Sequence, residues 1–465
     1  MGAENLENHR IARDTLGEIK VPKDAYYGAQ TQRAVENFPI SGLRLPRAFI
    51  RAQAIIKRSA AIANRDTGQI EEKKANAIIQ AAEEVMEGKL DEQFVVDAYQ
   101  AGAGTSQNMN ANEVIASRAS EILGGERGDW TKVHPNDDVN MAQSTNDTIH
   151  VAINIAVAEE LHRQLYPALE KTIQALEEKA EEFRPFIKSG RTHLQDAVPM
   201  RLGQSFDGYA QSIKNAYDAV KLAEPFLYEI GLGGNAVGTG INSHPEYSDR
   251  AIKAVSESTG LGFQQPKNRF SFMQNTGAAI RVSHALKEIA IHLIKVSSDF
   301  RLLSSGPRTG IAELNLPPVQ PGSSIMPGKV NPVIPENLYM ICSQVIGNDT
   351  CVSTAGIGSQ LEINPMMPII GYNVLQSITI LSTGMDTFTE RCIKGIEPNE
   401  SRMSELMENS LALATALNPK IGYEKAAEIA KESFRTGKTV REIILERGIM
   451  SEKEAADLLD PENLV

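Results

Sequence analysis

Residues 151–183 read VAINIAVAEELHRQLYPALEKTIQALEEKAEEF, and they indicate the class of fold more directly than any other part of the chain. An α-helix has about 3.6 residues per turn, so apolar residues three or four positions apart share one face. Leucine and isoleucine have this spacing here, at Leu161, Leu165, Leu169, Ile173 and Leu176. The stretch therefore predicts one long amphipathic helix.

Helical spacing recurs along much of the chain, whereas alternating β-branched residues are rare. Comparable patterns cover 46–65, 69–87, 205–230, 275–304, 335–348 and 366–391. Helices with one apolar face must bury that face, and with few strands available they bury it against each other. We therefore expect an all-α, mainly helical protein with a central bundle of long helices.

Two stretches rich in glycine, proline, aspartate and asparagine interrupt these patterns, at 124–138 and 394–401. Such residues favour turns, so both stretches predict domain boundaries. In the last segment, Ser451 and Glu454 have the spacing of a capping box at a helix start. We expect a mostly helical N-terminal domain at 1–140, a central long-helix bundle at 141–395 and a small helical C-terminal domain at 396–465.

Composition excludes several classes of protein. The chain has 465 residues, 42% of them apolar and 23% charged, which is ordinary for a globular enzyme. Its formal net charge of −12 argues against a nucleic-acid partner, because such binding needs many lysines and arginines. Three cysteines without a CxxC pair fit a reducing compartment, and no apolar run is long enough to span a membrane. We expect a cytoplasmic protein.

Glycine-rich segments and histidines do not match familiar cofactor or metal motifs. The segment GSSIMPGK at 322–329 has one residue too many between its glycines for a P-loop, and valine follows its lysine. The run GLGGNAVGTG at 231–240 follows a predicted helix, so we expect a loop between helices and no dinucleotide site. The eight histidines are dispersed, without an HExxH pattern. We therefore expect no nucleotide at either glycine-rich segment and no metal.

Polar side chains gather instead in five short loops that together suit a small dicarboxylate. Their hydroxyls, amides, histidines and lysine can donate to the lone pairs of carboxylate groups. Each loop alone could equally cap a helix, and the two roles coincide where a helix N-terminus binds an anion. The loops are GTSQNMN at 104–110, HPND at 134–137, STND at 144–147, GRTHLQD at 190–196 and GSSIMPGKVN at 322–331.

The last of these loops has the pattern of a mobile lid with reactive groups. A serine hydroxyl becomes a base only when a cation or backbone dipoles stabilise its alkoxide, and Lys329 is a candidate cation for Ser323. The alternative for Ser323 is a turn serine that bonds its own backbone. His193 suits a proton carrier or a polar network, with Glu336 as its candidate partner. Six other histidines are interpreted as structural: His9, His150, His162, His244, His284 and His292.

The sequence GSSIMPGKVNP at 322–332 resembles the signature loop of the fumarase and aspartase superfamily. Further blocks of the family follow in the same order, and the resemblance covers the chain from about residue 12 to 460. These blocks are DAYYGAQTQRA, GTSQNMNANEV, HPNDDVNMAQSTND, GRTHLQDAVPM, GLGGNAVGTGIN, LLSSGPR and IGYEKAAEIAK.

The resemblance implies a homotetramer in which five long helices from each subunit build a twenty-helix core. It also implies active sites formed by loops of three subunits, which eliminate water or ammonia from a dicarboxylate to give fumarate without a cofactor. By matching motif, Ser323 would be the base, Lys329 and Asn331 would stabilise an aci-carboxylate intermediate, and Glu336 would orient His193. The substrate-binding residues carried over are Thr105, Ser106, Asn108, Ser144, Thr145, Asn146, Thr192, Ser324 and Asn331. A possible second dicarboxylate site comprises His134, Asn136 and Asp137.

The choice between the two reactions depends on where the motifs depart from each type. The segments 103–106, 144–147 and 331–333 look like aspartase, whereas the HPND segment, YYGAQTQRA and 336–340 are closer to fumarase. We predict elimination of ammonia from L-aspartate, with fumarate hydratase as the alternative. A catalytically inactive helical scaffold is a remote alternative, because Ser323 and Lys329 are both present.

Overall fold

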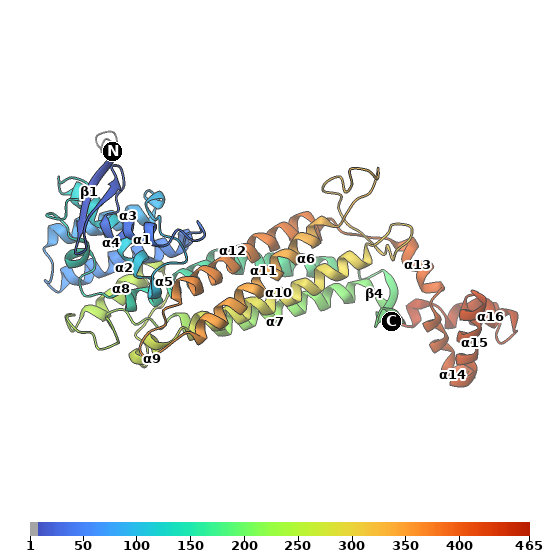
Figure 1. The fold of residues 1–465 in the computed structure, drawn as a ribbon. Coiled ribbons are helices and arrows are strands. Elements are labelled where there is room, and N and C mark those ends of the chain that lie inside the picture. Colours follow the sequence, from blue (N-terminus) through green and yellow to red (C-terminus); the bar gives the residue numbers. More distant parts are fainter. Residues whose placement is uncertain (1–7) are drawn as a thin grey trace. The chain divides into compact units, whose positions relative to one another are not determined.

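The structure is a computed structural model that describes residues 8–465, and most of these residues are helical (Figure 1). Helices α1 to α17 are joined by loops and by three short antiparallel strand pairs. The predicted all-α, mainly helical class is confirmed. The three strand pairs were not expected from the sequence. Each is short and too rich in polar residues to show alternating β-branched side chains. Within residues 8–465 no helix is long and apolar enough to cross a membrane.

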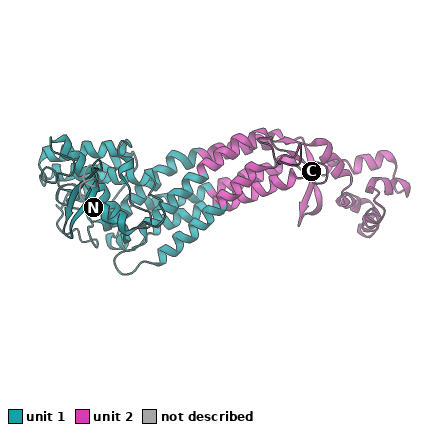
Figure 2. Cartoon of the chain, turned by 45° about the horizontal axis from the view of Figure 1, so that its top comes forward, with its two compact units in different colours: residues 1–167, 217–288, 343–381 teal, residues 168–216, 289–342, 382–465 magenta. Residues whose placement is uncertain are grey.

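The chain divides into two compact units, shown in different colours in Figure 2. Unit 1 contains the chain up to residue 167 together with 217–288 and 343–381, and unit 2 contains 168–216, 289–342 and 382–465. The divisions fall inside five long helices, α6 (Tyr166–Glu182), α7 (Leu202–Ala223), α10 (Gly277–Leu303), α11 (Val333–Ile357) and α12 (Met367–Arg391). The expected domain boundaries at residues 140 and 395 stay a prediction.

The N-terminal part of unit 1 has a helical core beside a hairpin. Strands β1 (His9–Asp14) and β2 (Gly17–Pro22) pair with His9 opposite Pro22. Alanine and isoleucine side chains of the helices fill the core, and they are fully or almost fully buried. The helices are α1 (Ala29–Asn37), α2 (Arg47–Asp66), α3 (Glu72–Met86) and α4 (Thr105–Ile122). Two more helices of this unit, α8 (Tyr247–Thr259) and α9 (Arg269–Gln274), come later in the chain.

The long helix predicted at 151–183 is present. Helix α5 (Thr145–Glu160) continues through the π-helical turn Leu161–Leu165 into α6. All five apolar residues that predicted the helix are buried, so their spacing did mark the face that packs against other helices. Ser144 caps the N-terminus of α5 in a capping box with Asp147.

In unit 2 the long helices pack through aromatic rings. Phe206 of α7, Phe300 of α10 and Phe388 of α12 are all buried, and the ring of Phe300 lies 5.3 Å from that of Phe206 and 5.5 Å from that of Phe388. Helices α6 and α12 are joined by a hydrogen bond of 2.9 Å between the buried hydroxyls of Thr172 and Thr389. These contacts hold the helices side by side within the unit.

The remainder of unit 2 consists of two strand pairs and the C-terminal helices. Strands β3 (Ile187–Thr192) and β4 (Gln195–Arg201) form a hairpin, and β5 (Leu314–Asn315) pairs with β6 (Glu397–Pro398). The helices are α13 (Glu400–Glu408), α14 (Asn418–Ile421), α15 (Tyr423–Thr436), α16 (Val440–Glu446) and α17 (Glu452–Leu458), and α14 to α17 share a small apolar core. The predicted capping box of Ser451 and Glu454 is present at the start of α17.

Candidate active site

Three of the predicted polar loops lie in unit 1, and two of them mark the starts of α4 and α5. Thr105 begins α4 directly after Gly104, whose φ of 76° is a left-handed conformation that favours glycine. A side chain on Gly104 would also collide with Ile149 of α5, so the two helix starts approach closely there. Thr105 is exposed, whereas Ser106 beside it is buried. The start of α4 therefore presents the exposed hydroxyl of Thr105 close to the start of α5.

Asp147 ties the glycine-rich segment 231–240 to the start of α5. Its buried carboxylate accepts backbone N–H groups from Ser144 at 2.9 Å, Gly233 at 3.0 Å and Asn235 at 2.9 Å. Burial raises the pKa of Asp147 to about 6, against the opposing effect of these donors. The segment is a loop between helices, as expected. Its role is to shape the site, because the Nδ2 of Asn146 donates to the carbonyl oxygen of Ala236 at 2.9 Å.

Lys57 is a central residue of this site that the sequence reasoning missed. It lies on α2 and is only 1% exposed. Its Nζ donates to three side-chain oxygens, Asn108 Oδ1 at 2.8 Å, Asn140 Oδ1 at 3.0 Å and Gln143 Oε1 at 2.9 Å. Burial lowers the pKa of Lys57 to about 7, while the charge of Asp147 and the three oxygens favour the ammonium form. A lysine inside the apolar pattern AIIKRSAAIA was the available signal.

The Lys57 contact fixes the direction of the next hydrogen bonds. Because Asn108 Oδ1 faces the ammonium, its Nδ2 must donate, and it does so to Thr145 Oγ1 at 3.1 Å. The hydroxyl of Thr145 then has its own proton left to donate elsewhere. Ser144 Oγ accepts the backbone N–H of Asn146 at 3.2 Å, so the hydroxyl proton of Ser144 is also available to a ligand. Asn146 donates through its Nδ2, and its Oδ1 therefore remains an acceptor.

The predicted residue His134 also lies in unit 1, where it shapes a turn. Its Nδ1 accepts backbone N–H groups from Asn136 at 3.3 Å and Asp137 at 3.1 Å, at the start of a π-helical turn. Its own backbone N–H donates to Asp138, which pairs with Lys74. The three residues proposed as a second dicarboxylate site are thus neighbours in one turn.

In unit 2, Thr192 and His193 lie at the tip of the β3–β4 hairpin, where both are exposed. The sequence had predicted only a polar loop at 190–196. Thr192 pairs with Gln195, so the turn consists of His193 and Leu194, with φ of 55° and 61°. Two positive φ values in a two-residue turn are typical of type I′ hairpins. A polar loop of this kind carries no β-strand signal, which explains the error.

A buried ion pair anchors strand β3 of this hairpin beside the turn. The guanidinium of Arg191 bonds both carboxylate oxygens of Glu313 at 2.9 Å, and Glu313 is 0% exposed. Lys188 Nζ lies 3.3 Å from the same carboxylate, and burial lowers the pKa of Lys188. The two partners are 122 residues apart in sequence, so the pattern of residues could not reveal the pair.

We expect Arg191→Met to lower the free energy of unfolding by about 3 kcal/mol, because it leaves a buried carboxylate with one cation only. Urea unfolding of the intact protein measures this. Arg184→Met is the matched control, since Arg184 pairs with Glu181 on the surface and such pairs contribute about 0–1 kcal/mol. Equal losses in the two variants would show that the buried pair does not stabilise the hairpin.

The loop at 322–331 also lies in unit 2 and is closed by its own hydrogen bonds. Gly322 N donates to the carbonyl of Lys329 at 2.9 Å, and Asn331 Nδ2 donates to the carbonyl of Gly322 at 2.8 Å. Ser323 Oγ accepts backbone N–H groups from Ile325 at 3.3 Å and Met326 at 3.0 Å. These are the contacts of a turn serine that bonds its own backbone, and the same two N–H dipoles would stabilise an alkoxide on this oxygen. Ser324 and Lys329 are exposed, and Glu336 lies in the first turn of α11.

Comparison with known proteins identifies the family. A family model described as Lyase matches residues 17–347, and one described as Fumarase C C-terminus matches residues 413–465. The chain belongs to the fumarase/aspartase superfamily of lyases. The five polar loops are therefore the candidate active-site loops of a fumarase/aspartase superfamily enzyme.

Individual relatives of this superfamily member include enzymes of both named types. The chain is 48% identical over 458 residues to fumarate hydratase class II of Halobacterium salinarum, covering 98% of this chain and 97% of that one. It is 46% identical over 455 residues to aspartate ammonia-lyase of Bacillus subtilis, covering 98% and 96%. A solved class II fumarase from Schistosoma mansoni matches with a TM-score of 0.94 at 36% identity, over 97% of this chain and 98% of that one.

Proposed function

We propose that this superfamily member releases ammonia from L-aspartate to give fumarate, in a reversible reaction. The observation that carries the proposal is the orientation of Asn146. Its Nδ2 bonds the carbonyl of Ala236, so its Oδ1 can accept an N–H from a substrate ammonium. Thr145 and Ser144 beside it keep protons for a substrate carboxylate. The aspartase-like residues at 103–106, 144–147 and 331–333 support the same choice.

In the proposed mechanism Ser323 removes the proton next to a carboxylate. Negative charge then grows on that carboxylate, and an exposed cation at Lys329 with the amide of Asn331 would stabilise the resulting aci-carboxylate. His193, oriented by Glu336, would handle the proton of the leaving group. The two N–H groups bound to Ser323 Oγ support its role, because they make its alkoxide less costly. Thr105, Ser144, Thr145, Asn146 and Thr192 would hold the substrate.

We further propose that a homotetramer completes each active site with loops from three subunits. One group of candidate residues lies in unit 1, and the hairpin tip and the 322–331 loop lie in unit 2. Exposed apolar side chains on the long helices support association, among them Ile291 of α10 and Met340 and Ile357 of α11. Burial of large exposed apolar side chains against another chain removes them from water, which favours association.

Hydration of fumarate to L-malate is the second candidate reaction. The HPND segment, with His134 at its start, is closer to fumarase, and the named relatives include class II fumarate hydratases at similar identity. The malate hydroxyl can also donate to Asn146 Oδ1, so the two substrates differ at this atom only in the number of donors.

Fumarate production tests the choice directly. The purified protein is incubated with L-aspartate and, separately, with L-malate, and the ultraviolet absorbance of the fumarate double bond is followed. We expect turnover with L-aspartate. Turnover with L-malate alone would replace the proposed substrate by the second candidate, and no turnover with either would leave the scaffold interpretation.

A further inference from the structure

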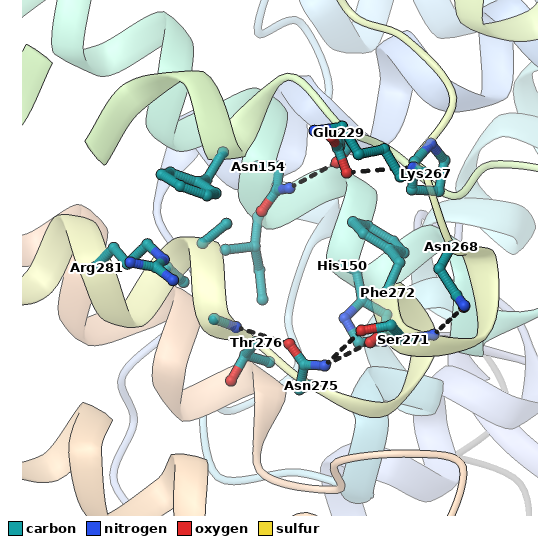
Figure 3. Close-up of a pocket in the computed structure, with 16 residues that line it drawn as sticks. His150, Asn154, Glu229, Lys267, Asn268, Ser271, Phe272, Asn275, Thr276 and Arg281 are labelled. Carbon is teal, nitrogen blue, oxygen red and sulfur yellow. Dashed lines mark hydrogen bonds between the residues drawn. The ribbon is translucent and has the colours of Figure 1, made fainter. Parts of the chain in front are cut away.

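A cavity in unit 1 lies beside the first turn of α10, and several of its polar side chains bond to the protein itself (Figure 3). Asn154 Nδ2 donates to the carbonyl of Glu229 at 3.3 Å, and Asn275 Nδ2 donates to the carbonyl of Ser271 at 2.5 Å. His150 Nε2 has no partner in residues 8–465, but it has almost no accessible surface, so a molecule in the cavity cannot bond it. The lining of this cavity therefore does not mark a ligand site.

Helix α15, in the C-terminal part of unit 2, has large apolar side chains on its surface (Figure 1). Ala426 and Ile429 face the small apolar core that the C-terminal helices share. Two aromatic side chains of the same helix lie outside that core, because Tyr423 is 77% exposed and Phe434 is 81% exposed. Exposed aromatic rings that lie together on one face are typical of a contact surface.

The two rings share a face of α15 with two alanines. Tyr423, Ala427, Ala430 and Phe434 follow each other at intervals of four, three and four residues, which is the spacing of a seam between two packed helices. Both alanines are only partly buried. This stripe of four residues has a ring at each end and small side chains in the middle. A second helix that runs in the opposite direction can therefore approach closely at the alanines, with a ring beside a ring at each end.

Charged residues along one side of the stripe are separated by sign. Glu424 and Glu428 lie in the first half of α15, Lys431 and Arg435 lie in the second half, and all four are exposed. None of these four forms an ion pair within residues 8–465. Each also has a like charge four positions away, which disfavours an isolated helix slightly. Their order suits the helix dipole, but the dipole does not account for the apolar stripe beside them.

A second copy of the same helix, turned end for end, supplies the opposite charges. The antiparallel arrangement places Lys431 of the second copy beside Glu428, and Arg435 of the second copy beside Glu424, and the same contacts repeat in the other direction. A parallel copy would place the two charged sides on opposite edges of the pair, where they do not meet. Charge complementarity therefore favours an antiparallel copy of this chain as the occupant.

We propose that α15 is a contact surface through which two copies of this chain pair in antiparallel orientation. The helix has 14 residues and is about 21 Å long, so the pair buries about 400 Å² in total, below the roughly 1,200 Å² of a stable interface. The contact is therefore weak alone, and it forms at high protein concentration or between copies that other surfaces already hold together. It is independent of the proposed reaction, because α15 carries none of the candidate catalytic residues.

Disulfide trapping in the intact protein tests the pairing. Ala427→Cys combined with Ala430→Cys places thiols in the middle of the stripe, and mild oxidation should give a covalent dimer on non-reducing electrophoresis. Lys425→Cys combined with Thr436→Cys is the matched control, because both residues are exposed on the other side of α15. The control should form dimer about tenfold more slowly or not at all. The wild type should form none, since its three cysteines are buried or half-buried.

Charge reversal separates self-pairing from contact with a different protein. In the background of the stripe cysteines, Glu428→Lys alone and Lys431→Glu alone should each slow dimer formation about tenfold, because each sets like charges together twice in the pair. The double reversal should restore the rate, because the opposite charges then meet again with their places exchanged. Lys425→Glu should change nothing.

All of the charge reversals replace exposed residues, so the variants should fold, and circular dichroism checks this. A covalent dimer that is specific to the stripe cysteines and is rescued by the double reversal would support the pairing. The absence of a covalent dimer, equal rates for the stripe and control cysteines, or a double reversal that fails to restore the rate would overturn the proposal.

Discussion

Ser323→Ala is expected to lower kcat by about a hundredfold to ten-thousandfold, the range that a general base contributes. The hydroxyl oxygen of Ser323 receives N–H groups from Ile325 and Met326, and alanine leaves these dipoles without the atom that they stabilise. The loop itself should persist, because its closure depends on Gly322, Lys329 and Asn331. Initial rates of fumarate formation measure the effect, with KM determined separately.

Ser324→Ala is the matched control for that variant. The neighbouring hydroxyl is exposed and receives neither of the two N–H groups. Because Ser324 is a candidate substrate-binding residue and not the base, its loss should act mainly on KM and lower kcat far less. Circular dichroism and gel filtration should show the same fold and oligomeric state for both variants. Comparable kcat values for Ser323→Ala and the wild type would rule out Ser323 as the base.

Lys57→Met is expected to have the second large effect, on both stability and activity. Methionine replaces the aliphatic stem but leaves the oxygens of Asn108, Asn140 and Gln143 buried without the ammonium. An unsatisfied buried polar group costs about 1–3 kcal/mol, so we expect the free energy of unfolding to fall by about 3 kcal/mol in total. Activity should fall about tenfold or more. The side-chain amide of Asn108 can then rotate, and it no longer fixes the orientation of the Thr145 hydroxyl.

Lys74→Met provides the control in the same unit. Lys74 bonds Asp138 as a partly exposed pair, and its loss should cost about 0–1 kcal/mol with little change in kcat. Urea unfolding and steady-state kinetics on both variants give the comparison. If Lys57→Met matched Lys74→Met in both measurements, the buried lysine would not orient the site.

The shifted pKa of Lys57 also predicts a pH dependence of stability. Its pKa is lowered from 10.5 to about 7 in the folded protein, so between these values the unfolded chain holds a proton that the folded chain has released. The contribution of Lys57 to folding stability therefore rises with pH above about 7 and is constant below it. Between about pH 7 and about pH 9, the wild type should gain about 2 kcal/mol relative to Lys57→Met. A constant difference would show that Lys57 keeps its proton over this range.

Much of the fold follows from local patterns in the sequence. Residues such as Leu165, Leu169 and Ile173 recur at helical spacing, and each is buried on the face that the spacing predicts. Ser451 and Glu454 form the expected capping box, since capping needs only residues three positions apart. The β3–β4 hairpin escaped prediction, because its polar turn at His193 resembles any other loop.

The sequence alone determined the helical class, the family resemblance and the polar loops from which an active site can be built. Each of these depends on residues close together in the chain. Only the tertiary structure decided that Lys57 directs Asn108 and that Glu313 holds Arg191. These features depend on burial and on partners far apart in sequence. Burial removes a charged or polar group from water, and its energy then depends on the partners that the folded chain provides.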